Sequence, residues 1–309
     1  MLQTEPAKVR LSVSEAKDRI RRNPYGLNLN DVSSFEPGAA KEVATKHGPV
    51  YLNGLRVLTV EDAAELAKYK GPELHLDGLD QISEGAMQEF ASRSSRARLY
   101  FGLSSLSDGV AEAIGKLRDD VFLNRVTELS LANAQHISTP GSGFMSLDGL
   151  TDVSTELASK LVQRRGALSL SGLTKLTKPL AEALTAARHQ LWLNGLTDLS
   201  PFDANVIASD SRTLYLDGLT ALSDETASAL ARSIALSLNK LAHLTDSVAV
   251  ILGNMKGRLT LNGVEELSDE AAKSLATYKG SGMELKKPKS LSDSALAALE
   301  SNDNIKLTT

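Results

Sequence analysis

The side chains that most often carry chemistry are sparse in this 309-residue chain, and none has the spacing of a reactive site. Cysteine is absent, which excludes a thiolate nucleophile, a thiolate metal site and a disulfide framework. No two histidines have metal-ligand spacing, since each lies in a different part of the chain: His47, His75, His136, His189 and His243. We therefore expect no bound metal and no cofactor.

The sequence also lacks the glycine-rich motifs that bind phosphate groups or dinucleotides. Gly141-Ser142-Gly143 is too short to indicate the nucleophile elbow of a serine hydrolase. With no candidate catalytic residue, we expect that the protein is not an enzyme.

An Asn or Asp recurs at one position of a repeat of about 23 residues, and this is the clearest polar pattern in the chain. A calcium site is one interpretation, but the Gly-Gly-x-Gly-x-Asp repeat of calcium-binding β-rolls is missing. Asn is also more frequent than Asp here, which favours hydrogen bonding between adjacent repeats. We predict a structural ladder that includes Asn53, Asp77, Asn124, Asp148, Asn194, Asp217, Asn239 and Asn262.

The repeat itself extends over almost the whole chain. A plain copy reads Leu191-Trp192-Leu193-Asn194-Gly195-Leu196-Thr197-Asp198-Leu199-Ser200, followed by an Ala- and Leu-rich stretch. A short fixed period is typical of a solenoid, in which each unit contacts only its neighbours. The first apolar residues of the copies are Leu27, Val50, Leu74, Leu99, Val121, Met145, Leu168, Leu191, Leu214, Leu236, Leu259, Met283 and Ile305.

Each copy predicts a short strand, a turn and a helix. Alternation such as Leu191-Trp192-Leu193 indicates a strand with one buried face. The Asx-Gly pair that follows favours a turn, since both residue types tolerate positive φ. Next comes a Ser or Thr that is suited to be a helix N-cap: Thr59, Ser83, Ser107, Ser130, Ser154, Thr177, Ser200, Ser223, Thr245, Ser268 and Ser292.

These units predict an α/β fold, a curved right-handed solenoid with a parallel sheet on the concave side and short helices on the convex side. The stack curves because helices are wider than the spacing between strands. The sequence resembles the leucine-rich repeats, and more closely a bacterial variety with Leu-x-Leu-Asn-Gly-Leu-x-x-Leu-Ser units. One departure is that Asn194 follows Leu193 directly, whereas the common form places its Asn three residues later. The resemblance implies a binding scaffold, most often for a protein, and implies no activity.

The outward-facing middle residue of each strand is constrained least by the fold. This position is rich in aromatic residues, although Phe, Trp and Tyr make up only 4% of the chain. The predicted binding stripe on the concave side contains Tyr51, His75, Tyr100, Phe122, Trp192 and Tyr215. A protein or peptide ligand is the favoured partner, because aromatic residues are enriched at interfaces. Stabilisation of the sheet by aromatic pairs is the structural alternative. Carbohydrate binding and a purely structural or assembly role also stay open.

The ends of the chain predict further features. Residues 1–26 are expected to form an N-terminal helical cap, with Ser14 as the helix N-cap and the helix ending near Asn23-Pro24. Residues 27–309 form the solenoid of about 12 units plus a final strand, so that we expect a single domain. After the last strand-like segment, either the natural protein continues or the open strand edge pairs with another chain.

In the degenerate copy from Val121 to Gly143, no helix can continue past Pro140.

Composition limits the partners and the compartment. The net charge of −4 and the absence of a basic stripe argue against a nucleic-acid partner. No apolar run is long enough to span a membrane, so we expect no membrane insertion. The absence of cysteine and of an apolar signal-peptide region near Met1 favours the cytoplasm, although export and a removed leader stay open.

Overall fold

The computed structural model describes residues 9–138, 142–187, 190–208, 212–289 and 291–308. The chain forms two compact units. The first contains Met1–Leu150 and Gln163–Ala167, and the second contains Thr151–Val162 and Leu168–Thr309. The boundary at residue 26, and a single domain over the whole chain, stay predictions.

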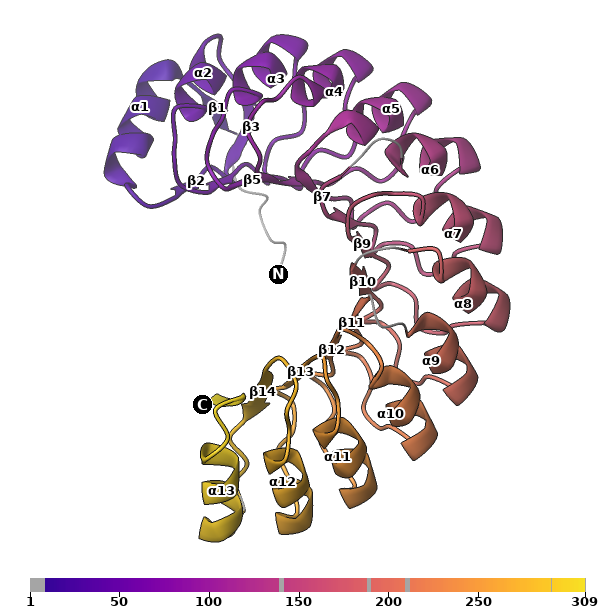
Figure 1. Ribbon diagram of the computed structural model, residues 1–309. Helices are drawn as coiled ribbons and strands as arrows, with labels where there is room; N and C mark the ends of the chain where they lie inside the picture. The colour runs from indigo at the N-terminus through magenta and orange to yellow at the C-terminus, as the bar shows by residue number, and fades with distance from the viewer. Residues whose placement is uncertain (1–8, 139–141, 188–189, 209–211, 290, 309) are drawn as a thin grey trace, which may run out of the picture. The chain divides into compact units, whose positions relative to one another are not determined.

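In the first unit strands and helices alternate along the chain, except that two strands follow each other after the first helix (Figure 1). Its elements are β1 (Val9–Leu11), α1 (Val13–Arg22), β2 (Leu27–Asn28), β3 (Val32–Phe35), α2 (Ala39–Val43), β4 (Val50–Tyr51), α3 (Val60–Leu66), β5 (Glu73–Leu76), α4 (Glu84–Ala91), β6 (Arg98–Phe101), α5 (Asp108–Lys116), β7 (Asp120–Phe122), α6 (Leu131–Ser138) and β8 (Met145–Ser146). Helix α6 ends before Pro140, which lies outside the described residues.

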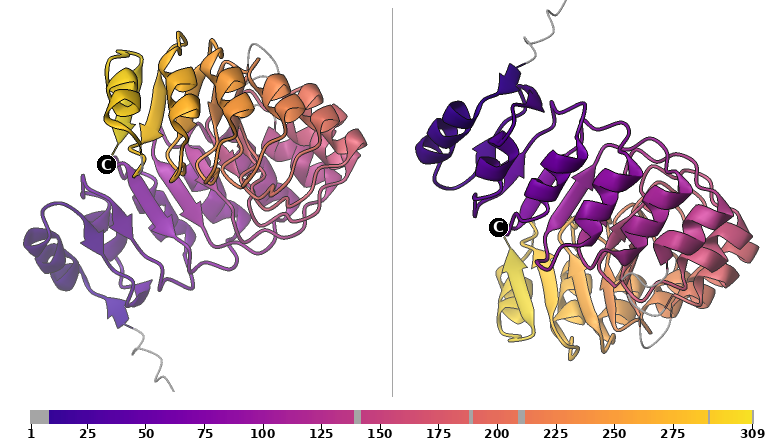
Figure 2. Two further views of the ribbon diagram at one scale, coloured as in Figure 1. Left: turned by 90° about the horizontal axis from the view of Figure 1, so that it is seen from below. Right: turned by 90° about the horizontal axis from the view of Figure 1, so that it is seen from above.

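The second unit repeats the same alternation. Its elements are α7 (Thr155–Leu161), β9 (Leu168–Ser169), α8 (Lys178–Leu184), β10 (Gln190–Trp192), α9 (Pro201–Ile207), β11 (Thr213–Tyr215), α10 (Asp224–Leu230), β12 (Ala235–Ser237), α11 (Asp246–Gly253), β13 (Arg258–Leu261), α12 (Asp269–Ala276), β14 (Met283–Lys286), α13 (Asp293–Glu300) and β15 (Ile305–Thr308). In Figure 2 its helices, whose colours run from pink to yellow, lie side by side in one layer.

The strands of each unit align in the register that the sequence repeat predicts. In the first unit the first apolar residues of neighbouring strands are partners, from Leu27–Val50 on to Val121–Met145. In the second unit they are partners from Leu168–Leu191 on to Met283–Ile305. All these pairs are parallel, which agrees with a helix between successive strands.

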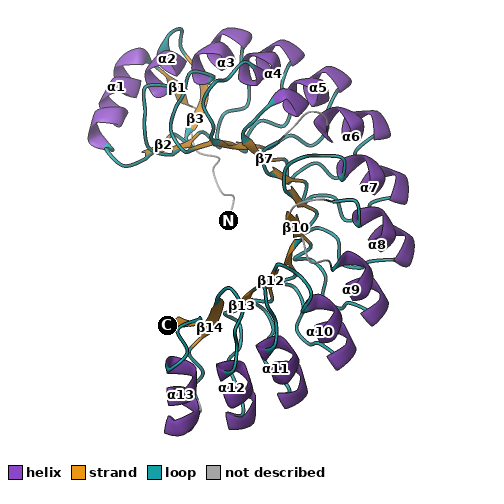
Figure 3. Cartoon of the chain, in the orientation of Figure 1, coloured by secondary structure: helices purple, strands orange, loops and turns teal. Residues whose placement is uncertain are grey.

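Within each unit the strands follow the inner side of the curve and the helices follow the outer side (Figure 3). The core lies between these two layers. Leu191 and Leu193 of one copy are fully buried there, and so is Leu196 after the turn. The fold is therefore an α/β solenoid with a parallel sheet, as the repeat predicts.

The Ser and Thr residues before the helices are N-caps, which confirms the sequence prediction. In α3, for example, the backbone N–H of Asp62 donates to Thr59 Oγ1 over 3.1 Å. The other residues of the predicted set accept the same bond, with the exception of Thr177 before α8, which makes no side-chain cap. The side chain thus fixes where almost every helix begins.

The reason for the Asx-Gly turn differs from the prediction. No non-glycine residue among those described has positive φ, and only Gly38 and Gly282 do among the glycines. The turn glycines are instead required by close approach of the preceding coil. A Cβ on Gly218 would lie 2.3 Å from the carbonyl oxygen of Asn194, and one on Gly263 would lie 2.0 Å from that of Asn239. Steric space, rather than backbone freedom, selects glycine here.

The N-terminal segment differs from the predicted cap in two details. The N-cap of α1 is Ser12, whose side chain accepts from the Glu15 N–H, and Ser14 lies inside the helix. The helix ends at Arg22 with Asn23 as its C-cap, close to the predicted end. The sequence did not predict that β1 pairs in parallel with β3 as a separate two-stranded sheet.

Candidate functional site

Four predicted stripe residues of the first unit form a continuous ring stack on the inner face of the sheet. They come from β4, β5, β6 and β7, whose register places them side by side. The ring centroids are 4.5 Å apart for Tyr51 and His75, 4.0 Å for His75 and Tyr100, and 4.2 Å for Tyr100 and Phe122. Neighbouring planes are inclined by 25°, 5° and 12° in the same order. All four side chains are half-buried, and neighbouring rings cover both faces of His75 and of Tyr100.

Acidic side chains lie beside the stack at His75. Its Nε2 is 3.4 Å from Glu73 Oε2, and its Nδ1 is 3.4 Å from Asp77 Oδ2. Arg98 on β6 donates from Nη1 to the other oxygen of Glu73 over 2.9 Å. Burial raises the pKa of the Tyr100 hydroxyl, and the charge of Glu73 adds to this effect. The stack therefore presents aromatic edges, a neutral phenol and flanking carboxylates.

A fifth ring, which sequence reasoning missed, extends this stack. Phe144 lies just before β8, and its centroid is 5.2 Å from that of Phe122 with planes inclined by 52°. It occupies the residue before the first apolar position and not the predicted outward position. Only its aromatic type, next to an aromatic-rich set of strands, signalled this contact.

In the second unit, the predicted residues Trp192 and Tyr215 form a stacked pair. They are partners on β10 and β11, with centroids 4.2 Å apart and planes inclined by 3°. Both side chains are half-buried. The two clusters of the predicted stripe thus belong to different units.

Serines at the same strand position do not present free side chains, contrary to the expectation that every middle residue faces outward. Ser146, Ser169 and Ser237 are buried. Ser237 shows the reason, because its Oγ donates to Asp217 Oδ1 over 2.6 Å and accepts from Asn239 Nδ2 over 2.9 Å. A serine side chain is short enough to bond with the Asx side chains of the turns, whereas an aromatic ring at the same position extends beyond them.

A hollow of about 220 Å³ lies next to Tyr215 on this face. Ser237 and Ala235 line it together with Thr260 and Arg258 of β13. Arg258 donates from Nη2 to Glu284 Oε1 over 2.7 Å, and its side chain is 59% exposed. The hollow therefore combines one aromatic wall, a hydroxyl at its base and a cation at its rim.

The Asx positions lie in the turns at the ends of the strands and form hydrogen bonds along each unit. In the first unit Asn53 N–H donates to Asn30 Oδ1 over 3.0 Å, and Asp77 N–H donates to Asn53 Oδ1 over 3.4 Å. Asn124 Oδ1 accepts from Ser146 Oγ over 2.6 Å. Asp148 holds the corresponding turn position after β8.

The second unit has a longer series of the same bond. Its first acceptor is Ser171, which replaces the Asx residue and accepts from Asn194 N–H over 3.2 Å. The backbone N–H of each later Asx residue then donates to the Oδ1 of the one before it at 2.9–3.0 Å, through Asn194, Asp217, Asn239 and Asn262. Each side chain so pairs a backbone donor that the tight turn leaves without a strand partner.

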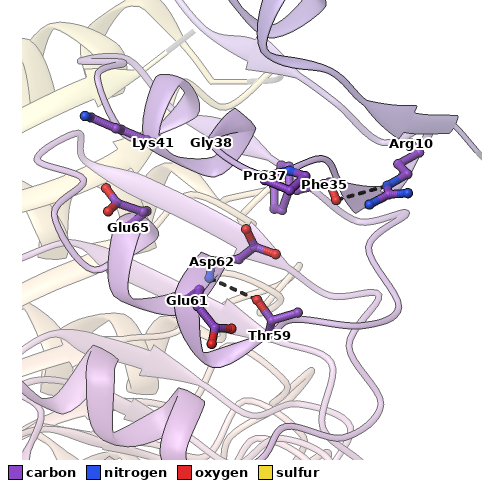
Figure 4. A pocket seen from close by; sticks show the side chains of 9 residues that line it. All are labelled: Arg10, Phe35, Pro37, Gly38, Lys41, Thr59, Glu61, Asp62 and Glu65. Atoms are coloured by element: carbon purple, nitrogen blue, oxygen red, sulfur yellow. Dashed lines mark hydrogen bonds between the residues drawn. The ribbon is translucent and has the colours of Figure 1, made fainter.

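A larger hollow, of about 480 Å³, lies between α3 and the loop that joins β3 to α2 (Figure 4). Arg10, Lys41 and Phe35 line one side, while the carboxylates of Asp62 and Glu65 line the other. Burial raises the pKa of Asp62. The hydrogen bond with Thr59 lowers this pKa in part, and the charge of Glu61 raises it further. The two walls therefore differ in charge.

Sequence reasoning also missed a set of buried basic side chains that donate to carbonyl groups at the ends of helices or in the segments that follow them. Arg212 donates from Nη1 to Ile207 O over 2.5 Å, and from Nη2 to Thr185 O and Ala187 O over 2.6 and 2.8 Å. Other members are Lys46, Arg93 and Arg164. Burial lowers the pKa of Arg164 to about 10 and lowers that of Arg212. These cations satisfy carbonyls that a helix leaves unpaired.

The parts of the chain that the structure describes contain no group of three or more His, Asp or Glu side chains placed to hold a metal ion. Among the same residues, no helix has the length and apolar character to cross a membrane.

Comparisons with known proteins bear on the fold. No protein-family model matches the sequence, and no curated protein matches it either. The structure is similar to a chain of the yeast Rad7–Elc1 complex, with 16% identity and a TM-score of 0.53 over 96% of this chain and 83% of that one. An internalin (inlF) of Listeria monocytogenes matches with 16% identity and a TM-score of 0.42, over 96% of this chain and 89% of that one.

A leucine-rich-repeat protein of Leptospira interrogans matches with 17% identity and a TM-score of 0.44, over 98% of this chain and 85% of that one. The likeness to the yeast chain, together with the parallel strands that alternate with helices, defines the architecture. The chain has a leucine-rich-repeat-like solenoid fold.

Proposed function

We propose that the protein is a non-enzymatic binding scaffold that recognises a protein or peptide through the aromatic residues on the inner face of its sheet. The observation that carries the proposal is the ring stack of Tyr51, His75, Tyr100 and Phe122, which stays half-buried on that face. Aromatic side chains that offer much area and little rotamer freedom are typical of binding hot spots. In the second unit, Trp192 and Tyr215 are proposed to act in the same way.

The geometry of the stack favours a peptide over a sugar. A carbohydrate packs against the flat face of an aromatic ring, but the faces of His75 and Tyr100 are covered by neighbouring rings 4.0–4.5 Å away. Their edges, the Tyr100 hydroxyl and the flanking Glu73 suit a chain that offers amide donors and apolar side chains. The similar yeast chain comes from a complex of two proteins, which agrees with a protein partner for this fold.

A peptide library displayed on phage tests the proposal, with the purified protein as bait. We expect enriched peptides that bind the wild-type protein. Binding should fall at least tenfold in the double variant Tyr100→Ala/Phe122→Ala if the first-unit stack carries the contact, since a hot spot contributes about 2 kcal/mol or more. Trp192→Ala/Tyr215→Ala tests the second unit separately.

The control is Tyr25→Ala, because this side chain is 90% exposed and lies outside the stripe. Circular dichroism checks that each variant keeps its helices. Peptides that bind both double variants as well as the wild type would contradict the proposed surface. Enrichment on a glycan array, with no enriched peptide, would favour the carbohydrate alternative.

Assembly through a strand edge is a second candidate with its own observation. Within the described part of the second unit, β15 pairs with β14 and with no other strand. An unpaired strand edge offers a row of backbone donors and acceptors to another chain. Light scattering over a hundredfold range of concentration tests this role, and a constant monomer mass would contradict it.

A further inference from the structure

The aromatic pair of the second unit ends at Tyr215, because the next strand carries no ring at this position. Trp192 on β10 and Tyr215 on β11 stack, but the next residue in register, on β12, is Ser237. Ser237 is buried and bonded to Asp217 and Asn239, so that its side chain does not cover the outer face of the Tyr215 ring. The hollow of about 220 Å³ lies at this place and is lined by Tyr215, Ser237, Thr260 and Arg258.

The dimensions of the hollow fit one aromatic ring. Strands of a sheet are about 4.8 Å apart, and the chain stacks its own rings on consecutive strands at 4.0–4.5 Å. A ring from outside that entered above Ser237 would thus lie at stacking distance from Tyr215. Pockets for drug-sized ligands occupy about 300–1,000 Å³, so this smaller hollow suits a single side chain.

The rim of the hollow suits the backbone of a peptide. Arg258 donates from Nη2 to Glu284 Oε1, while its Nε and Nη1 have no hydrogen-bond partner among the described residues. The Arg258 side chain is 59% exposed, and its guanidinium group retains donors for a carbonyl or carboxylate oxygen. A ligand that fits this hollow has a ring to stack on Tyr215 and an oxygen to accept a hydrogen bond from Arg258. An aromatic amino-acid residue in a peptide has both.

We propose that this hollow binds one aromatic side chain of a peptide partner, with its ring stacked on Tyr215 above Ser237 and its backbone carbonyl bound by Arg258. The inference rests on the proposed function, since it specifies the chemistry that the second-unit cluster recognises. It predicts a preference for Tyr, Phe or Trp at one position of the bound peptide.

Saturation-transfer NMR with small probes tests the hollow directly. N-acetyl-tyrosinamide should show saturable binding in the millimolar range, and N-acetyl-leucinamide should bind at least tenfold more weakly. The variant Ser237→Phe fills the hollow from within and should weaken binding of the tyrosine probe at least tenfold. The matched control Val250→Phe adds the same ring on α11, at a side chain that is 49% exposed and remote from the hollow, and should bind as the wild type does.

A second variant keeps the test decisive if Ser237→Phe fails to fold. Tyr215→Leu removes the stacking wall and should abolish the preference for the tyrosine probe over the leucine probe. Equal binding of the two probes by the wild type, or unchanged binding by Ser237→Phe and Tyr215→Leu, would overturn the inference.

The proposed function can survive that result. Peptides from the library that bind the wild type and Ser237→Phe equally, but not Tyr100→Ala/Phe122→Ala, would support the scaffold and reject the hollow. A library that yields no peptide, together with selective binding of the tyrosine probe, would support the hollow as a ring-binding site and reject recognition by the first-unit stack.

Discussion

The rings of His75 and Tyr100 lie face to face, with centroids 4.0 Å apart and planes inclined by 5°. Tyr51 stacks on the other face of the imidazole ring, and Phe122 stacks on the other face of Tyr100. Each strand thus contributes one ring, at the spacing that the parallel sheet sets. The same stack that offers a binding surface must therefore also stabilise the sheet, and the two roles can be separated by experiment.

His75→Ala tests the structural role of the stack. The change removes two ring contacts, each of about 0.5–1.5 kcal/mol, and should lower the free energy of unfolding by about 1–2 kcal/mol in urea titrations. His75→Phe preserves a ring at this position and is the control, with an expected loss below about 1 kcal/mol. If His75→Ala and His75→Phe are equally stable, the stacking contact contributes nothing to the fold.

Gly218→Ala tests the steric origin of the turn glycine. The added Cβ would lie 2.3 Å from the Asn194 carbonyl oxygen, so we expect a loss of about 2 kcal/mol or more in the free energy of unfolding. Gly218→Asn should be as harmful, because Asn tolerates positive φ but also carries a Cβ. Gly85→Ala in α4 is the control, since the added Cβ would meet only a side-chain methyl group, Cγ2 of Val60, at 3.2 Å. A mild effect of Gly218→Asn would favour the conformational explanation.

Register and helix starts could be predicted because the repeat states them many times over. Leu214 is the strand partner of Leu191, and Thr59 is the N-cap of α3. Both follow from the types of a few residues that are close together in the sequence. The sequence misled where the cause lies a full coil away. Gly218 is fixed by the carbonyl of Asn194, and this distance along the chain hides the contact from any local pattern.

The candidate site shows the same division. Alternation predicted that Trp192 and Tyr215 share one face, and they stack there. It did not predict that the Ser237 hydroxyl is buried against the turns, because this depends on hydrogen bonds with Asp217 of the preceding coil and Asn239 of its own coil. Nor did it predict Arg212, since a basic residue beside a helix end is normally solvated.

Arg212→Ala tests the buried cation of the second unit. Its loss leaves three carbonyl groups without their donor, and we expect a decrease of about 3–5 kcal/mol in the free energy of unfolding. Arg212→Lys should restore little of it, because an ammonium group lacks the fork that reaches all three oxygens. Arg232→Ala is the control, since Arg232 is exposed and bonds from Nη2 to Asn205 O across its coil. Full stability of Arg212→Ala would show that water replaces the guanidinium group.

Tyr69→Phe tests a buried phenol of the first unit. The Tyr69 hydroxyl lies 2.7 Å from both Gly48 O and Glu73 O, which share its single O–H donor, and burial raises its pKa to about 12. A tyrosine in the unfolded chain has a pKa of about 10. The native state therefore holds the proton more tightly, and its stabilising effect is complete below pH 10 and is lost as the pH rises from 10 to 12. In urea titrations at pH 9 and 11.5, the stability advantage of the wild type over Tyr69→Phe should shrink by roughly 2 kcal/mol.

Tyr25→Phe is the control for the loss of a hydroxyl, because this side chain is 90% exposed, and at pH 9 its free energy of unfolding should match that of the wild type. Absorbance at 295 nm reports the same event directly, since Tyr69→Phe should remove a phenolate component with a midpoint near pH 12. Tyr278 has the same kind of contact, with its hydroxyl bonded to Gly257 O and Gly282 O, and its pKa is also raised by burial. A component that disappears near pH 10 instead would mean that water reaches the Tyr69 hydroxyl in the folded protein.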